Sequence, residues 1–314
     1  MKKFDVVALG EILIDMTYAG KSENGQTLFE QNPGGAPANV LSAVATLGLN
    51  TAFIGKVGND MHGEFLRGVL KKHNICDKNL ITSNEAFTTL AFVSLSETGE
   101  RTFSFARKPG ADTMLKKEEV DFDLIKNSSV FHFGSLSLTD EPSKTATIES
   151  VKFAKENGVA VSYDPNYRAL LWKDKDHAKE GMRLPLKYVD IIKISDEETE
   201  LLTDEKDPKK AIEKLISMGI SCVIVTMGGD GSYIGTKDGI VKIDVAPCEK
   251  VVDTTGAGDS FMGGFLFKLC ENKKKPNELT LDELIEFGSF ASKVAAFCIG
   301  RRGAIDAMPK IDEI

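Results

Sequence analysis

The stretch VVDTTGAGDSFMGGF, at residues 251–265, holds the most informative pattern in the chain. An apolar run typical of a buried helix occupies its second half, although glycine is a poor helix residue. The first turn of a helix presents N–H groups that lack a partner within the helix and carry a partial positive charge. Gly256 and Gly258 let the backbone approach an anion closely, so the stretch predicts an anion-binding helix start.

A carboxylate, Asp259, falls in the first turn of this predicted helix. Phosphoryl transfer needs donors for the charge on the moving phosphoryl group and a base beside the attacking oxygen. A carboxylate next to an anion site supplies the base, since it can take a proton from a hydroxyl group brought up to that site. The same residues also fit a glycine-rich turn in which Asp259 only stabilises the helix start.

Several other catalytic motifs are absent from the sequence. It contains neither G-x-x-x-x-G-K-[ST] nor G-x-S-x-G, which excludes a Walker-A protein and a nucleophile elbow. The spacing Gly256-x-Gly258-x-x-Phe261 fails the dinucleotide fingerprint at its third glycine. The four histidines stand apart, and His62-x-Glu64 lacks the P-C-x-x-C sequence of a zinc deaminase.

Composition predicts an ordinary soluble globular protein with an acidic surface. Hydrophobic residues make up 42% of the 314 positions and charged residues 27%. The net charge of −8 argues against nucleic acid or an anionic membrane as a partner. No apolar run reaches the ~18 residues of a membrane span, and the N-terminus lacks a signal peptide. We therefore expect a cytoplasmic protein without a membrane partner.

The cysteines support the same location. Their number is odd, their spacing is wide and no C-x-x-C occurs, so we expect free thiols in a reducing cytoplasm. They are Cys76, Cys222, Cys248, Cys270 and Cys298.

Strand-like and helix-like segments alternate along most of the chain. Apolar runs typical of buried strands are separated by amphipathic or apolar helical patterns, the last two of which cover about 257–271 and 280–298. Alternation of this kind predicts a mostly parallel sheet with helices on both faces. We expect an α/β fold, a three-layer α-β-α sandwich, formed by residues 1–314 as a single domain.

Two segments interrupt the alternation. Residues of about 15–33 and 86–108 have the pattern of antiparallel strands, and ETGE at 97–100 is typical of the turn of a hairpin. We expect them to form a small sheet that projects from the main one as a lid over a ligand site. A plain sheet edge without a lid function fits the same pattern. Apolar residues on these strands also suit an interface between two copies of the chain, so we expect a homodimer formed through the lid.

Polar residues follow several of the predicted strands. Asp15, Gly34, Asn166 and Asp259 each come after a strand in this interpretation, and Asn39 begins the helix after the GGAPAN turn. Ligands of doubly wound folds bind outside the carboxyl ends of the strands. Carboxylate and amide groups are suitable partners for the hydroxyl groups of a polyol. The sequence therefore predicts a polyol site at one edge of the sheet.

Two further segments suit a nucleotide. TMGGDG at 226–231 ends a predicted strand with small residues that leave room for a ribose and phosphates. The acids at 196–198 follow another strand and can hold the waters around a magnesium ion. A helix start rich in acids explains those acids equally well.

Two long motifs resemble the signatures of the ribokinase-like (PfkB-type) carbohydrate kinases. They are GGAPANVLSAVATLGLNTAFIGKVGNDMHG at 34–63 and DTTGAGDSFMGGF at 253–265. Within that family the chain is most similar to fructokinases, through GEILID, RKPGADTML, DPNYRALLW and KISDEETELLT. The resemblance extends over the whole chain. It implies a ribokinase-like fold and the ATP-dependent phosphorylation of the primary hydroxyl group of fructose, with Mg²⁺.

The resemblance also implies roles for individual residues. Asp259 matches the catalytic base, and Gly256, Ala257 and Gly258 match the anion hole. The implied sugar contacts are Asp15, Gly35 and Asn39, and from their position in the sequence we add Gly34, Arg107, Asn166 and Arg168 to the substrate site. The implied nucleotide contacts are Lys193, Thr226, Gly228 and Gly231. Glu198 matches an acid that holds Mg²⁺ through water, in a motif usually written N-x-x-E, where this chain has Ser195. Asp253 and Thr255 resemble part of a site for a monovalent cation such as K⁺, completed by the backbone of 300–304.

Three alternatives remain at this stage. A 2-keto-3-deoxygluconate kinase of the same family would use Arg107 and Arg168 to bind a substrate carboxylate. A sugar sensor without catalytic activity would not need the intact Asp259. A dehydrogenase that uses NAD would need the missing third glycine.

Overall fold

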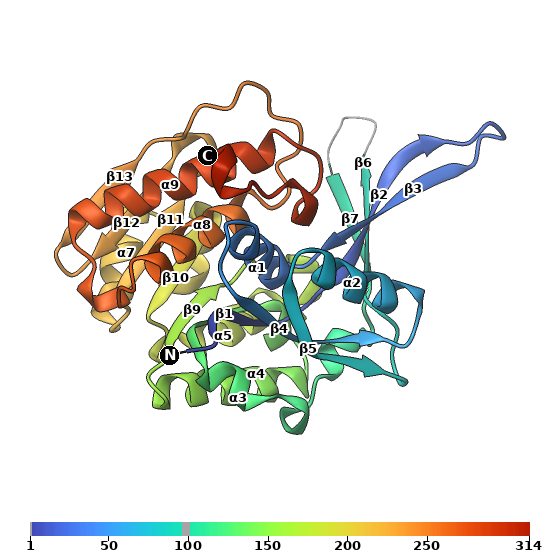
Figure 1. The fold of residues 1–314 in the computed structure, drawn as a ribbon, viewed down its shortest axis with the longest axis horizontal. Helices are drawn as coiled ribbons and strands as arrows, with labels where there is room; N and C mark the ends of the chain where they lie inside the picture. The colour runs from blue at the N-terminus through green and yellow to red at the C-terminus, as the bar shows by residue number, and fades with distance from the viewer. Residues whose placement is uncertain (1, 96–100) are drawn as a thin grey trace.

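A nine-stranded sheet runs through the middle of the protein, which we describe from a computed structural model over residues 2–95 and 101–314. Its strand order is β13-β12-β11-β10-β9-β8-β1-β4-β5 (Figure 1). The strands are β1 (Phe4–Leu9), β4 (Thr51–Gly58), β5 (Ile75–Ser83), β8 (Ser128–Gly134), β9 (Ala160–Asp164), β10 (Ile191–Ser195), β11 (Cys222–Thr226), β12 (Ser232–Thr236) and β13 (Gly239–Ile243). Among the described strands its antiparallel pairs are β11 with β12 and β12 with β13. The predicted mostly parallel sheet is confirmed.

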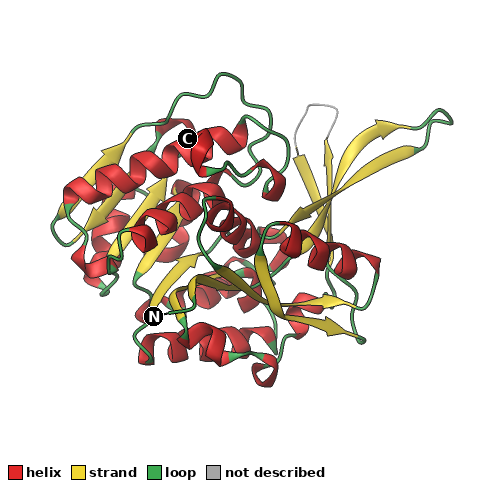
Figure 2. Ribbon diagram, viewed as in Figure 1, coloured by secondary structure: helices red, strands yellow, loops and turns green. Residues whose placement is uncertain are grey.

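Helices cover both faces of this sheet, as Figure 2 shows. A parallel sheet is buried on both faces, which is why β4, mostly apolar apart from Thr51 and Lys56, is buried throughout. One face packs against α1 (Ala36–Thr46), α2 (Met61–Lys72), α8 (Ala257–Glu271) and α9 (Leu281–Ile299). The other packs against α3 (Phe122–Lys126), α4 (Ser143–Glu156), α5 (Lys175–Arg183), α6 (Thr199–Thr203) and α7 (Pro208–Ser217). The predicted three-layer sandwich is therefore confirmed.

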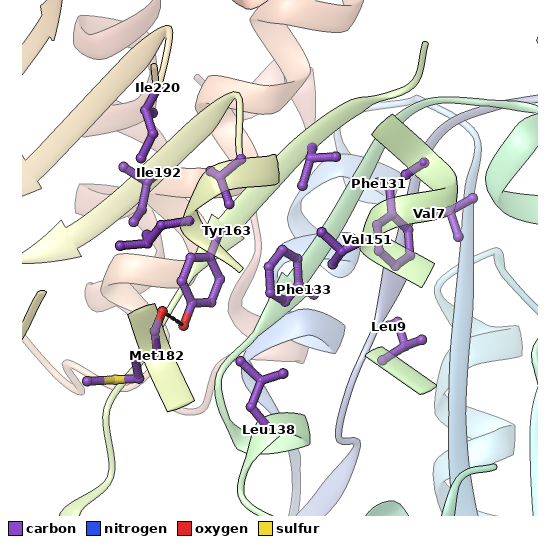
Figure 3. Close-up of a cluster of buried hydrophobic side chains, with 14 of the residues drawn as sticks. Val7, Leu9, Phe131, Phe133, Leu138, Val151, Tyr163, Met182, Ile192 and Ile220 are labelled. Atoms are coloured by element: carbon purple, nitrogen blue, oxygen red, sulfur yellow. Dashed lines mark hydrogen bonds between the residues drawn. The ribbon is translucent and has the colours of Figure 1, made fainter. Parts of the chain in front are cut away.

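An aromatic stack stabilises the sheet next to the ligand-binding edge. The rings of Phe133 and Tyr163 lie 4.5 Å apart between centroids, with 9° between their planes (Figure 3). The Tyr163 hydroxyl donates a hydrogen bond to the Met182 carbonyl oxygen of α5 at 3.3 Å. Burying each such ring contributes about 1.5–3 kcal/mol. This packing fixes the end of β9, where the next residue is Asp164.

A second sheet of four strands projects from the first, visible beside α2 in Figure 1. Its order is β3-β2-β6-β7, and its strands are β2 (Leu13–Lys21), β3 (Thr27–Gly34), β6 (Leu90–Leu95) and β7 (Arg101–Ala106). Each hairpin is antiparallel, as predicted, but the contact between the hairpins, β2 with β6, is parallel. The prediction of wholly antiparallel strands is wrong there, because each hairpin follows its own strand of the large sheet. The turn predicted at 97–100 lies outside the described residues.

Close helix packing explains why the buried helix α8 contains glycine at two interior positions. A Cβ atom on Gly263 would lie 2.5 Å from the Ala43 Cβ of α1. A Cβ atom on Gly264 would lie 2.9 Å from the Val294 Cγ2 of α9. Both helices therefore approach the α8 backbone at distances that no side chain permits. The glycines bring α1 and α8 together, and each of these helices begins at the ligand-binding edge.

We expect Gly263→Ala to destabilise the protein by about 1–3 kcal/mol, because overpacking of this contact outweighs the gain in helix propensity. Gly68→Ala is the matched control, since Gly68 is exposed in α2 and a Cβ there meets nothing within 4 Å. That control should gain about 0.5–1 kcal/mol. Urea unfolding midpoints measure both changes. Equal midpoints for the two variants would contradict the packing argument.

Candidate active site

A cavity of about 480 Å³ lies between the small sheet and the carboxyl ends of β9 and β10. Both motifs that carry the family resemblance contribute to its wall. Lining residues predicted from the sequence are Asp15, Gly35, Asn39, Asn166, Arg168, Lys193, Glu198, Asp253, Thr255, Gly256, Ala257, Gly258 and Asp259. The chain therefore brings most of the predicted residues together from segments far apart in the sequence.

Asp259 is buried in the first turn of α8, with 5% of its surface exposed. The Asn39 side-chain amide donates to its Oδ2 at 2.7 Å, and the Asn166 amide donates to its Oδ1 at 2.9 Å. Burial, followed by the nearby charge of Asp164, raises the pKa of Asp259 to about 6. The amide groups favour the ionised form and partly oppose this shift. The result is an oriented carboxylate whose pKa lies close to neutrality, as a general base requires.

The start of α8 has the geometry of an anion site. Gly256 precedes the helix with φ = 77°, and a Cβ there would lie 2.7 Å from the Ala304 Cβ. Within the described part of the chain no side chain caps this helix start. Gly256, Ala257 and Gly258 line the cavity, so their backbone can approach a bound group without hindrance from large side chains. The predicted anion hole and the predicted base are thus side by side.

A buried ion pair lies beside this helix start. Lys193 Nζ donates to Asp164 Oδ2 at 2.7 Å, and the two side chains are 6% and 1% exposed. Burial lowers the pKa of Lys193, but the charges of Asp164 and Glu198 outweigh it and hold that pKa above its ordinary value. A Cβ on Gly258 would lie 3.0 Å from Lys193 Nζ. The ammonium group therefore contributes a fixed positive charge next to the predicted anion hole.

Glu198 connects two of the segments that form the site. One carboxylate oxygen accepts the Tyr167 N–H at 2.6 Å and the other accepts the Ser195 N–H at 2.8 Å. Burial is the main cause that raises the pKa of Glu198, and the charge of Asp164 adds to it. The bond to Tyr167 holds the turn in which Asn166 adopts a left-handed φ of 49°. Glu198 thereby helps to hold Asn166 against Asp259.

Asp15 lies within β2, as the predicted strand segment at about 15–33 has it, and not at the carboxyl end of a strand of the large sheet, as the predicted polyol site assumed. The residue faces the cavity from the small sheet, opposite α8. Burial raises the pKa of Asp15 to about 6, and the charge of Arg168 partly opposes this shift. Gly34 lies on the neighbouring strand, where a Cβ would be 2.2 Å from Asp15 Oδ2. Only glycine there leaves the Asp15 carboxylate its position.

Two further positions differ from the sequence-based expectation. Asp259 follows a long loop, 244–256, and not a strand, because β13 ends at Ile243 and belongs to the antiparallel edge of the sheet. Arg107 does not line the cavity, since its guanidinium is buried in a separate cluster. It donates to Asp112 Oδ2 at 2.8 Å, to Thr139 Oγ1 at 2.9 Å and to the Leu136 carbonyl at 2.8 Å. Of the two predicted arginines, only Arg168 lines the cavity.

The predicted nucleotide turn lies outside the cavity, on an exposed part of the sheet edge. Thr226 pairs in register with the cavity-lining Ser195, so the turn begins one strand away. Gly228 and Gly231 have φ values of 53° and 87°, and a Cβ on Gly231 would lie 2.2 Å from the Ile243 carbonyl oxygen. The backbone conformation therefore requires glycine, and the turn presents little side-chain bulk next to the cavity.

The segments predicted to form a monovalent-cation site do meet. Asp253 Oδ1 accepts the Thr255 N–H at 2.9 Å and its hydroxyl at 2.7 Å. Asp253 Oδ2 accepts the Gly303 N–H at 3.2 Å. The juxtaposition of 253–255 with 300–304 is as expected, and ion binding there stays a prediction.

Glu11 is among the cavity-lining residues that the sequence interpretation missed. It lies directly after β1, and its Oε1 accepts the Ala36 N–H at the start of α1 at 3.0 Å. The signal that could have found it is the one applied to Asp15, a polar residue at the end of an apolar strand.

Comparison with known proteins agrees with this geometry. The family model described as pfkB family carbohydrate kinase matches residues 3–311. The chain belongs to this family. Probable fructokinase-6, chloroplastic, of Arabidopsis thaliana is 43% identical over 312 residues, covering 97% of this chain and 79% of the relative. Fructokinase-2 of Zea mays is 40% identical, covering 98% and 91%.

Solved structures of similar proteins support the same assignment. The ATP-bound fructokinase of Xylella fastidiosa has a TM-score of 0.92 at 30% identity, covering 100% of this chain and 97% of that one. The fructokinase of Vibrio cholerae O395, with fructose, ADP and calcium ion bound, has a TM-score of 0.88 at 29% identity, covering 98% and 96%.

Several sequence predictions are thereby confirmed for this pfkB-family kinase. The resemblance and the ribokinase-like fold are correct, and the chain is an ATP-dependent phosphotransferase that acts on a sugar hydroxyl. The five cysteines are free thiols. Among the described residues, no helix is long and apolar enough to cross a membrane.

The raised pKa of Asp259 predicts a stability change with a definite pH dependence. The pKa of this carboxyl group is about 6 in the folded protein and 3.8 in its unperturbed state. The folded protein therefore loses stability as the pH rises from the lower of these pKa values to the higher. We therefore compare the free energies of unfolding of Asp259→Asn and the wild type. The difference between them should shift in favour of the variant by about 1 kcal/mol between about pH 5 and about pH 8. Urea unfolding at both pH values measures this difference.

Glu249→Gln controls for the loss of one acidic charge, since Glu249 is exposed and outside the cavity. Its stability relative to the wild type should stay the same at both pH values. A pH-independent effect of Asp259→Asn would show that the carboxyl group is not destabilised by burial.

Proposed function

We propose that the protein is a fructokinase, which transfers the γ-phosphoryl group of ATP to the primary hydroxyl group of fructose to give fructose 6-phosphate and ADP. The observation that carries this proposal is the buried Asp259 carboxylate, held between two amide groups at the start of α8, inside a cavity. Relatives named fructokinase over nearly the whole chain support the choice of sugar.

In this proposal Asp259 takes the proton from the primary hydroxyl as that oxygen attacks the γ-phosphorus in line with the leaving ADP oxygen. The N–H groups of 256–258 and the Lys193 ammonium stabilise the charge that develops on the transferring phosphoryl group. Apolar side chains of the small sheet, including Leu13, Val93 and Phe105, line the cavity and exclude water that would compete as acceptor.

The residues present fit a Mg²⁺ ion held mainly by nucleotide phosphates and water. Asp164 Oδ1 is buried without a hydrogen-bond partner among the described residues, and Asp164, Glu197 and Glu198 line one side of the cavity. One or two carboxylates with several waters are the usual protein contribution to such a site. When bound, Mg²⁺ would neutralise charge on the phosphates. We propose that Glu198 acts there through water, because its two oxygens already accept backbone N–H groups.

The arginines favour fructose over 2-keto-3-deoxygluconate. Arg107 was expected to pair with the carboxylate of a sugar acid. Its guanidinium instead forms an ion pair with Asp112 and lies outside the cavity. Arg168 lines the cavity near the carboxylates of Asp15 and Asp259, which would repel a carboxylate substrate. Arg302, which also lines the cavity, is ion-paired with Glu30 at 2.7 Å. A neutral ketohexose avoids this repulsion.

We further propose a cytoplasmic homodimer that forms through the small sheet, and K⁺ binding near Asp253 and Thr255. Exposed apolar side chains on the β2–β3 hairpin support the dimer, and they are Tyr18, Leu28 and Phe29. For K⁺ the fit is weaker, since both Asp253 oxygens already accept hydrogen bonds. Solved fructokinases from Vibrio cholerae O395 contain calcium or potassium ions.

We expect Asp259→Asn to lower kcat by about 10²- to 10⁴-fold, because general-base catalysis contributes a factor of that order. Fructose binding, measured by calorimetry, should persist, since the amide preserves the shape of the side chain. Wild-type kcat/KM should fall below about pH 6 as the Asp259 carboxylate gains a proton. Near-normal turnover by Asp259→Asn, beside the Glu249→Gln control, would exclude the assigned base.

A sugar panel with ATP and Mg²⁺ tests the substrate. Release of ADP should be fastest with fructose and slow with ribose, glucose and 2-keto-3-deoxygluconate. Preference for 2-keto-3-deoxygluconate would replace fructose by that sugar acid. Absence of activity on every hexose and ketohexose would overturn the proposal.

A further inference from the structure

Glu11 is a buried carboxylate in the cavity wall that the proposed chemistry does not use. It lies in the connection from β1 to β2, with 3% of its surface exposed. Its Oε1 accepts the Ala36 N–H, while its Oε2 is buried without a hydrogen-bond partner among the described residues. A buried acceptor that lacks a donor has lost its hydrogen bond to water without replacement, which destabilises the folded state. A donor supplied by a ligand would remove that destabilisation.

The neighbouring side chains of Arg107 and Asp112 do not supply this donor. The charges of Asp112 and Arg107 act on Glu11, and burial together with the charge of Asp112 raises the pKa of Glu11 to about 7. The described hydrogen bonds of the Arg107 guanidinium go to Asp112, Thr139 and Leu136. Asp112 in turn accepts from Arg107 and from the Thr89 hydroxyl. The partner of Oε2 must therefore come from the cavity, which Glu11 lines.

A second acceptor in the same wall is also unpaired. Asn39 Oδ1 is buried without a partner in the described chain, while its Nδ2 holds Asp259. Asn39 follows Ala36, the residue bound by Glu11, by three positions on α1, a rise of about 4.5 Å. Both acceptors belong to residues that line the cavity, so both suit hydroxyl groups of one polyol. An anionic group is disfavoured, because Glu11, Asp15 and Asp259 all face the cavity.

We propose that Glu11 is a substrate-binding residue of this kinase. Its Oε2 accepts a hydrogen bond from a sugar hydroxyl other than the one that is phosphorylated. Its Oε1 holds the start of α1, and so keeps Asn39 against Asp259. The hydroxyl bound by Glu11 is distinct from the reacting one, because Glu11 lies against Ala36 at the start of α1, whereas Asp259 lies against Asn39 one turn further along that helix. This inference rests on the proposed sugar kinase function, but not on fructose as the sugar.

The test uses Glu11→Gln in the full-length protein. The amide oxygen can still accept the Ala36 N–H, while the other side-chain position becomes an NH₂ donor in place of an acceptor. We expect KM for fructose to rise about 10- to 100-fold, with KM for ATP and kcat within about twofold of wild type. Sugar affinity by calorimetry should fall by the same factor.

Monodeoxy analogues of fructose identify the hydroxyl and separate binding from structure. The wild type should bind one analogue, lacking a hydroxyl other than that at C6, at least ~10-fold more weakly than fructose. Glu11→Gln should lose that one discrimination and keep the others. The proposal is overturned if the variant discriminates among the analogues as the wild type does, or if kcat, ATP affinity and sugar affinity fall together. The wild-type panel alone also decides, since equal binding of every analogue would exclude the contact.

If the sugar panel above selects 2-keto-3-deoxygluconate, the same measurements are made with that sugar acid and its deoxy analogues. Failure of the fructose assignment is then seen in the wild type, and failure of the Glu11 assignment is seen only in the comparison with Glu11→Gln.

Discussion

The burial of one carboxylate, Asp259, is the constraint on which the rest of the site depends. A buried ionised group costs several kcal/mol unless neighbouring donors compensate for the lost water. Here the donors are Asn39 on α1 and Asn166 after β9, at 2.7 and 2.9 Å, and the N-terminal end of α8 adds a partial positive charge. Three distant segments must therefore meet within hydrogen-bonding distance. The close contact of α1 with α8 at Gly263 makes this possible, since it fixes the two helix starts relative to each other.

Groups of both charges line the cavity. Lys193 and the helix N–H groups of Gly256–Gly258 lie where the phosphoryl group would pass on the proposed function. The carboxylates of Glu11 and Asp15 also line the cavity, Asp15 from the small sheet itself. A neutral polyol with many hydroxyl donors suits these two carboxylates. One cavity can thus orient two unlike substrates so that their reacting groups meet at Asp259.

Local signals in the sequence predicted the elements well, and distant pairings escaped them. The helix predicted at about 257–271 is observed as Ala257–Glu271, because glycine at its start and the apolar run after it are both local features. The parallel contact of β2 with β6 depends on where two hairpins leave the large sheet, which no local pattern records. Arg107 was predicted as a substrate contact, but its guanidinium is buried against Asp112, a pairing that the sequence alone does not show. Glu11 was missed because the sequence does not show which oxygen of a carboxylate lacks a partner.

On the proposed function the two substrates would meet surfaces of different kinds, and this difference follows from what each must avoid. The predicted sugar contacts lie in a cavity closed on one side by the small sheet, whereas Thr226, Gly228 and Gly231 lie outside it on an exposed turn. Water is a competing acceptor only at the hydroxyl that attacks, so only that hydroxyl needs to be enclosed. An adenine ring distant from the reaction gains little from enclosure and must be released after each turnover. On the proposed function, the start of α8 is the boundary between these two surfaces, which is why its glycines and Asp259 belong to both.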